Sequence, residues 1–187
     1  MPCFLLSACS QFVIKSTDNA YIKCSKIMPI LENQVFLSCP LSKGPNAVVS
    51  HLEKLPTFVR NKDYDYGDGS VRFNARNASL FDLKLIDGKS LFLLNYHHND
   101  KGEETFSLFQ AIYFFETEED KNLSYYKIID LLEKKLMLTP QIKYDIAINT
   151  YQRYYLPCGS GINLKQTKDQ TDKHIIDILW VPDTSAK

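Results

Sequence analysis

At 187 residues and 21.6 kDa, the chain has the size of one ordinary domain, and we predict a single domain over residues 1–187. Hydrophobic residues (44%) and charged residues (24%) stand near globular averages, which excludes extensive disorder. The 22 basic and 22 acidic residues cancel, so the sequence lacks the positive excess that is typical of nucleic-acid-binding proteins, and we expect no such partner.

The first third of the chain contains three apolar runs that we interpret as strands, at residues 3–14, 20–30 and 34–41. A short helix is predicted to follow them. Pro45 suits the first helical position, because its fixed φ matches a helix and its missing N–H would have no partner there. Val48 and Leu52 then recur at helical spacing, and Pro56 ends the segment.

The middle of the chain, at about 71–115, alternates apolar and polar residues between compact turns, which is typical of an antiparallel meander. Four strands are predicted there, at 71–77, 80–86, 90–97 and 105–115. Asp87-Gly88 favours a tight turn between the second and the third, because glycine accepts the positive φ that this turn needs. The polar residues 60–70, which precede the meander, form the longest predicted loop.

A helix is predicted at 117–136. Thr117 can cap its first turn, and three acidic residues there interact favourably with the positive end of the helix dipole. Residues 140–155 are ambiguous: Ile142 to Ile148 alternate as in a strand, but the tyrosines recur at helical spacing. We favour a helix there and keep a strand as the alternative. A polar connector and a last strand at 175–181 follow. The predicted fold class is α+β, a mainly antiparallel sheet with one or two helices packed on one face.

The five cysteines form an odd set without a Cys-x-x-Cys pair: Cys3, Cys9, Cys24, Cys39 and Cys158. This pattern favours free thiols in a reducing, cytoplasmic compartment. The N-terminus lacks the basic residue that begins a signal peptide, and no apolar run approaches the roughly 20 residues of a membrane span. We therefore expect a soluble intracellular protein, released into a host cell if it is an effector.

Cys158 is a candidate nucleophile, because the flexible Gly159 and Gly161 follow it and could leave backbone N–H groups free to hold an oxyanion. A reactive thiolate also needs a base, usually a histidine. His97 and His98 end one predicted strand, and His174 opens another. The opposing interpretation is a small buried cysteine beside a turn, with ordinary surface histidines.

The loop around Asp63, Asp65 and Asp68 resembles a calcium site only superficially. An EF-hand needs an oxygen ligand, a glycine and a glutamate at positions that are here occupied by Gly67, Asp68 and Asn74. No zinc-ligand spacing, phosphate-binding loop, dinucleotide fingerprint or serine-hydrolase elbow occurs either. We expect neither a metal nor a cofactor.

Tyr64, Asp65 and Tyr66 could form a partner-binding tip on the long loop, since tyrosine is favoured at protein interfaces. Two functional classes stay open, beside a third interpretation, a small-ligand pocket between sheet and helix, which would leave no linear motif. The first is a non-catalytic protein-interaction or regulatory domain, of the kind found in small bacterial effectors and immunity proteins. The alternative is a cysteine-dependent hydrolase or transferase, with Cys158 as the nucleophile and a histidine as the base. The sequence does not decide whether the chain is an enzyme.

Overall fold

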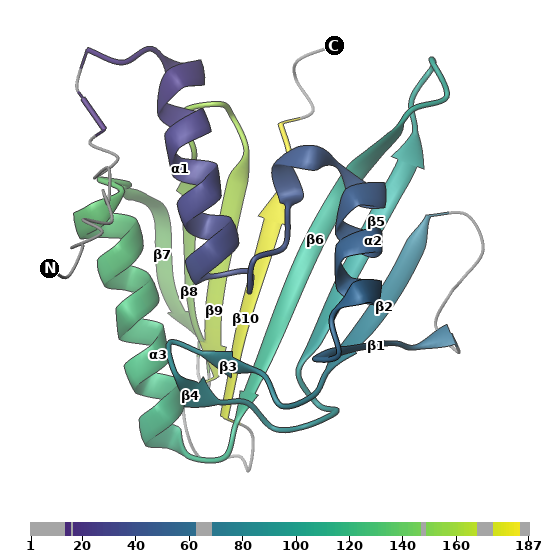
Figure 1. Cartoon of the computed structure of the whole chain (residues 1–187). Coiled ribbons are helices and arrows are strands. Elements are labelled where there is room, and N and C mark those ends of the chain that lie inside the picture. Colours follow the sequence, from purple (N-terminus) through teal and green to yellow (C-terminus); the bar gives the residue numbers. More distant parts are fainter. Residues whose placement is uncertain (1–13, 16, 63–68, 147–148, 168–173, 184–187) are drawn as a thin grey trace, which may run out of the picture.

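The structure is a computed structural model that describes residues 14–15, 17–62, 69–146, 149–167 and 174–183 (Figure 1). In these residues the dominant feature is one antiparallel sheet of eight strands. In spatial order the strands are β1 (Phe58–Arg60), β2 (Ser70–Ala75), β5 (Leu91–His98), β6 (Glu104–Phe115), β10 (His174–Val181), β9 (Gly161–Thr167), β8 (Asn149–Tyr155) and β7 (Pro140–Ile146).

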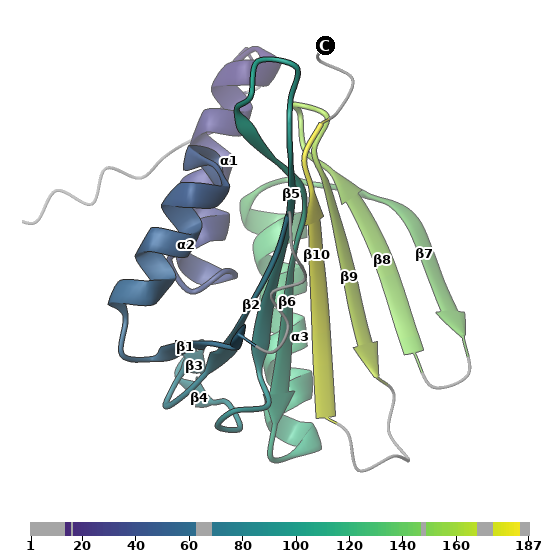
Figure 2. The ribbon, with the colours of Figure 1, turned by 90° about the vertical axis from the view of Figure 1, so that its right-hand side faces the viewer.

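Three helices pack on one face of this sheet: α1 (Ala20–Gln34), α2 (Pro45–Lys54) and α3 (Glu118–Asp130). The edge-on view shows all three on the same side, and no described helix covers the other side (Figure 2). A short 3₁₀ helix (Leu41–Lys43) precedes α2, and a π-helical turn (Leu131–Lys135) extends α3. The predicted α+β class, with an antiparallel sheet and helices on one face, is confirmed, although three helices replace the one or two expected.

Local signals explain why α2 and α3 begin where they do. Pro45 is the first residue of α2, as predicted from its fixed φ. The Thr117 hydroxyl accepts a hydrogen bond from the backbone N–H of Asp120 at 3.1 Å, which caps α3. Three acidic residues in the first turn of α3 face the positive end of the helix dipole.

The core lies between the helices and the covered face of the sheet. Phe109 in β6 is fully buried, and its ring packs edge-on against Phe36 from the helical layer and Phe92 from β5. The buried hydroxyl of Tyr113 donates a hydrogen bond to the carbonyl of Val35, just beyond α1. These contacts join segments that are far apart in the sequence into one hydrophobic core.

The prediction of strands in the first third of the chain is wrong within the described residues. Residues 20–34 form α1, and the Asn19 side chain caps this helix by accepting from the N–H of Ile22 at 2.9 Å. The buried residues of α1 recur at helical spacing: Cys24, Ile27, Met28 and Leu31. Most of the predicted strand at 3–14 lies outside the described residues.

The favoured helix at 140–155 is also wrong, because this segment forms the hairpin of β7 and β8. The alternation that begins at Ile142 therefore reflects a strand, and the helical spacing of the tyrosines is coincidental. In addition, part of the predicted polar connector belongs to β9, which pairs with both β8 and β10. The last predicted strand is confirmed as β10.

The meander is confirmed in outline and corrected in one place. Residues 80–86 do not enter the large sheet as a strand. They contribute to a small hairpin of β3 (Ser79–Leu80) and β4 (Leu83–Lys84), while β2 pairs directly with β5. The type I′ hairpin predicted at Asp87-Gly88 does not form, because β5 pairs with β2 and β6, although Gly88 adopts a positive φ of +72° in the turn before β5.

Candidate functional site

The sheet face that no described helix covers, the open face, has an apolar centre. One-sided antiparallel sheets usually present polar side chains to water on such a face. Here the half-buried residues that alternate with the buried core residues of β5, β6 and β10 are mostly aliphatic or aromatic: Leu93, Leu108, Ile112, Phe114, Ile175, Leu179 and Val181. The strand register brings them together, since Leu93 and Leu179 flank Gln110, and Phe114 lies opposite Ile175.

Three tyrosines and an arginine lie on the same face, on β7 and β8. Strand β9 separates them from β10, and Tyr155 comes nearest to the apolar centre because its partner Gly161 pairs in turn with Val181. Tyr144 and Tyr151 are cross-strand neighbours whose rings stack at 4.9 Å with an interplanar angle of 22°. Arg153 Nε donates to the side-chain oxygen of Asn163 on β9 at 2.7 Å. We call Tyr144, Tyr151, Arg153 and Tyr155 the tyrosine–arginine cluster.

The cluster is both accessible and internally ordered. Tyr144 is 44% exposed and Tyr155 is 49% exposed. Hydrogen bonds to Tyr155 and Tyr151 raise the pKa of the Arg153 guanidinium, although partial desolvation opposes this effect. Tyrosine and arginine are enriched among the few residues that contribute most of the binding energy at protein interfaces.

A carboxyl group lies in the middle of the apolar centre. Asp177 on β10 is opposite Ile112 on one side and Lys165 on the other. Gln110 Nε2 donates to Asp177 Oδ1 at 2.8 Å. Burial raises the pKa of Asp177, while the hydrogen bond from Gln110 and the charge of Lys165 oppose the rise.

This raised pKa predicts how stability depends on pH. Because the folded state holds the Asp177 proton more tightly than the unfolded state, Asp177 destabilises the fold as pH rises through the folded pKa. We expect Asp177→Asn to increase the free energy of unfolding at neutral pH and to flatten its pH dependence above the ordinary aspartate value. Denaturant unfolding from pH 4 to 7 measures both effects. A variant that loses stability equally at every pH in this window would contradict the prediction.

Cys158, the predicted nucleophile, is bonded to Cys24 of α1 in a disulfide of 2.07 Å. The expectation of free thiols is therefore corrected at these two positions. The two cysteines lie 134 residues apart, and only the packing of α1 beside the β8–β9 turn brings them together. Cys39 is a free, buried thiol whose pKa is raised by burial, and Cys3 and Cys9 lie outside the described residues.

The sheet topology does not bring the candidate histidines to Cys158. His174 begins β10, whose other end, Val181, pairs with Gly161 beside the Cys158 turn. The eight residues of β10 thus separate the two by roughly 23 Å at 3.3 Å per residue. His97 contacts Ser107 and Thr105, at 2.9 and 3.1 Å, three strands away from that turn.

The remaining candidate, His98, faces Glu104 at 3.7 Å. Asp183 packs against Gly159, so an acidic side chain is the neighbour of the turn that carries Cys158. The cysteine-nucleophile hypothesis stays a prediction. While the Cys24–Cys158 bond is intact, Cys158 has no thiolate to offer.

Two other predictions concern the long loop and metal binding. Tyr64, Asp65 and Tyr66, the predicted partner-binding tip, lie outside the described residues, as does most of the acidic loop that includes Asp63. Within the described ranges, no three histidine, cysteine or carboxylate side chains gather closely enough to hold a metal ion. Nor does any described helix combine the length and the apolar character needed to cross a membrane.

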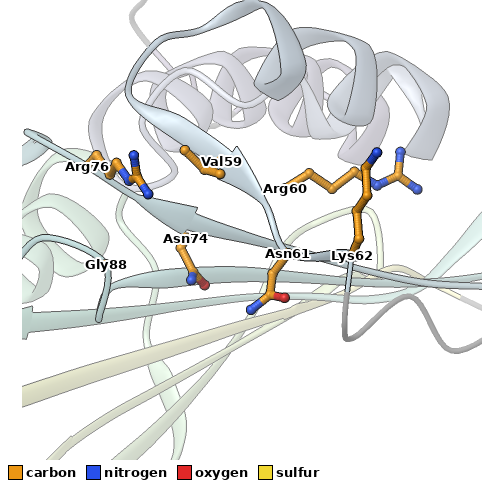
Figure 3. Close-up of a pocket in the computed structure, with 7 residues that line it drawn as sticks. All are labelled: Val59, Arg60, Asn61, Lys62, Asn74, Arg76 and Gly88. Carbon is orange, nitrogen blue, oxygen red and sulfur yellow. The ribbon is translucent and has the colours of Figure 1, made fainter.

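A shallow pocket of about 350 Å³ lies at the β1–β2 corner of the sheet and is rich in basic residues (Figure 3). Arg60 and Lys62 point toward the helices, whereas the amides of Asn61 and Asn74 point the other way. Arg60 already pairs with Glu53 at 2.7 Å. The positive charges do not converge on one point, so this pocket lacks the geometry of an anion site.

Comparisons with protein-family models, with curated proteins and with solved structures found no match. Support for the site therefore comes from its geometry alone. Sequence reasoning missed the tyrosine–arginine cluster because it placed Tyr151 and Tyr155 on a helix. The alternation from Ile142 onward was the available signal, since in a strand Tyr144 and other residues two positions apart share one face.

Proposed function

We propose that this protein is a non-catalytic interaction domain that binds a partner protein through the open face of its sheet. The observation that carries the proposal is the tyrosine–arginine cluster on the same uncovered face as an apolar centre. Tyrosine and arginine side chains on one face with half-buried aliphatic residues have the composition that is enriched at protein interfaces.

The charges of the open face define the chemistry of the partner. By strand register and burial pattern, Arg72, Arg153 and Lys165 lie on this face, and Asp177 is the acidic side chain among them. With three basic side chains and one acidic side chain, the described part of the face is net positive around an apolar centre. We infer a partner surface with aliphatic residues ringed by carboxylates, because complementary charge steers association and excludes wrong partners.

Protein is favoured over nucleic acid because the centre of the face is largely aliphatic. Single-stranded nucleic acids bind to aromatic platforms lined by positive charge, whereas here the aromatic rings lie at one side of an aliphatic patch. The balanced overall charge of the chain points the same way. The disulfide favours an oxidising compartment over the reducing one expected from the sequence, and we infer that the partner is met there.

The test is a selection of displayed peptides against the oxidised full-length protein. We expect aliphatic peptides rich in Asp and Glu whose affinity falls at least about 30-fold on Arg153→Glu and on Tyr155→Ala, the size of a hot-spot effect. Tyr126→Ala is the matched control, because Tyr126 is 65% exposed on α3, in the helical layer. It should leave the affinity unchanged.

Two outcomes would contradict this proposal. Peptides that depend on Tyr126 and not on Tyr155 would place the binding surface on the helical layer. Tight binding of a single-stranded oligonucleotide, abolished by Arg153→Glu, would show that the cluster is a nucleic-acid platform. Both variants should be compared with the parent protein by thermal unfolding, so that a loss of binding is not mistaken for a loss of structure.

A further inference from the structure

The edge strand β7 presents an unpaired side of the sheet. Among the described strands it pairs with β8 alone, and Gln141 to Asp145 are all exposed. A row of unpaired backbone N–H and C=O groups at such an edge is a template for another strand. Natural sheets often protect such edges with lysine or proline, but Pro140 is the first residue of β7 and leaves the later backbone groups in place, and Lys143 can be paired by a carboxylate on an incoming strand.

The sequence of β7 is complementary to itself in one antiparallel register. If Tyr144 lies opposite Tyr144 of a second copy, Lys143 falls opposite Asp145, and the same pair forms again across the two-fold axis. A shift of two residues in one direction places Lys143 opposite Lys143. A shift in the other direction places Asp145 opposite Asp145. Opposite charges across a strand pair stabilise it, and like charges destabilise it, so a single register is favoured.

We propose that two copies of this chain associate edge to edge through β7, centred on Tyr144, and form one continuous sheet across the dimer. The occupant is a second copy because the charge pattern complements itself. A foreign strand would need its own matching charges, and nothing in the described part of β7 selects it.

The two faces of the joined sheet support this register. Tyr144 lies on the open face, where it stacks on Tyr151, so the pairing sets two such stacks side by side. In this register, residues that point to the open face of one copy lie opposite residues that point to the open face of the other. The two open faces therefore form one continuous surface. Each copy would contribute its tyrosine–arginine cluster to the same face of the dimer.

Lys143 and Asp145 lie on the opposite face of β7 from Tyr144, by the alternation of strand side chains. Asp145 is also close enough to α3 to contribute to the raised pKa of Tyr125, which burial dominates.

The test combines charge reversal with mixing. Sedimentation velocity on the oxidised full chain, at concentrations up to about 1 mM, should show a species of twice the 21.6 kDa chain mass. Lys143→Asp alone and Asp145→Lys alone each create two like-charge pairs, and each should weaken dimerisation at least about 10-fold. An equimolar mixture of the two variants should form a heterodimer. In it, both acidic side chains of the first variant, at positions 143 and 145, lie opposite the two lysines of the second.

If the mixture forms the heterodimer, both variants are folded, and the weaker dimerisation of each variant alone is then due to its charges and not to misfolding. A monomeric parent protein at every concentration would overturn the proposal. Single variants that dimerise like the parent, or a mixture that stays monomeric, would also overturn this register. Arg153→Glu should leave the dimer intact, and Lys143→Asp should leave peptide binding intact, which separates this inference from the proposed function.

Discussion

Replacing Leu94 with alanine should lower the free energy of unfolding by about 3–5 kcal/mol. Leu94 is fully buried on the covered face of β5, where it is the cross-strand neighbour of Val71 and Phe109. The substitution removes buried methyl groups and leaves a cavity that a packed core fills only in part. Urea unfolding followed by circular dichroism measures the change in the midpoint at constant slope.

Leu93 is the matched control, because it is the same residue type in the same strand on the opposite face. Leu93 is half-buried between Arg72 and Gln110, so Leu93→Ala should cost less than about 1.5 kcal/mol. Equal losses at the two positions would mean that the open face is covered in solution, and the proposed binding surface would then be wrong. Unequal losses would leave Leu93→Ala as a folded variant for testing the apolar centre in peptide binding.

Removing the disulfide with Cys24→Ser and Cys158→Ser together should destabilise the fold by about 2–5 kcal/mol. The bond joins residues 134 positions apart, so without it the unfolded chain gains the freedom of a long loop. For a chain of this size, such a loss lowers the melting temperature by roughly 4–20 °C. Differential scanning calorimetry of the oxidised protein and of the double variant tests this.

Reduction supplies an independent check on the same bond. The parent protein in excess dithiothreitol should melt at the temperature of the double variant, and the double variant should not respond to dithiothreitol. Cys39 is buried and free, so it should not contribute to the difference. A parent protein that is indifferent to reduction would show that the bond does not form in solution. In that case the thiol of Cys158 would become available, and its alkylation rate against pH would test the cysteine-nucleophile hypothesis.

The described helices cover the sheet on one side, and this gives the described part of the protein two different surfaces. The covered side carries the stability, because it holds the large aromatic core around Phe109. The open side can then carry interaction residues whose replacement costs little stability. If β7 also pairs with a second copy, the dimer presents two tyrosine–arginine clusters on one surface, which strengthens binding to a repeated or dimeric partner.

The local sequence was sufficient to predict the elements whose first residue and whose spacing of apolar side chains depend on neighbouring residues. Pro45 and Thr117 marked the starts of α2 and α3, and alternation identified β5, β6 and β10. These features follow from backbone geometry and capping, which act over a few residues. The fold class followed in turn, because an antiparallel sheet with few helices has few ways to bury its apolar side.

Tertiary structure decided what depends on contacts between distant residues. The strand predicted at 20–30 is part of α1, whose local signals, the Asn19 cap and the helical spacing of its buried residues, were weaker than its apolar character. The tyrosines of residues 140–155, by contrast, match both periods until β8 pairs with β9. The pairing of β6 with β10 joins positions 59 or more residues apart, and the disulfide joins positions 134 residues apart. Local pattern carries no information about which distant segments meet, so these features could be read only from the folded chain.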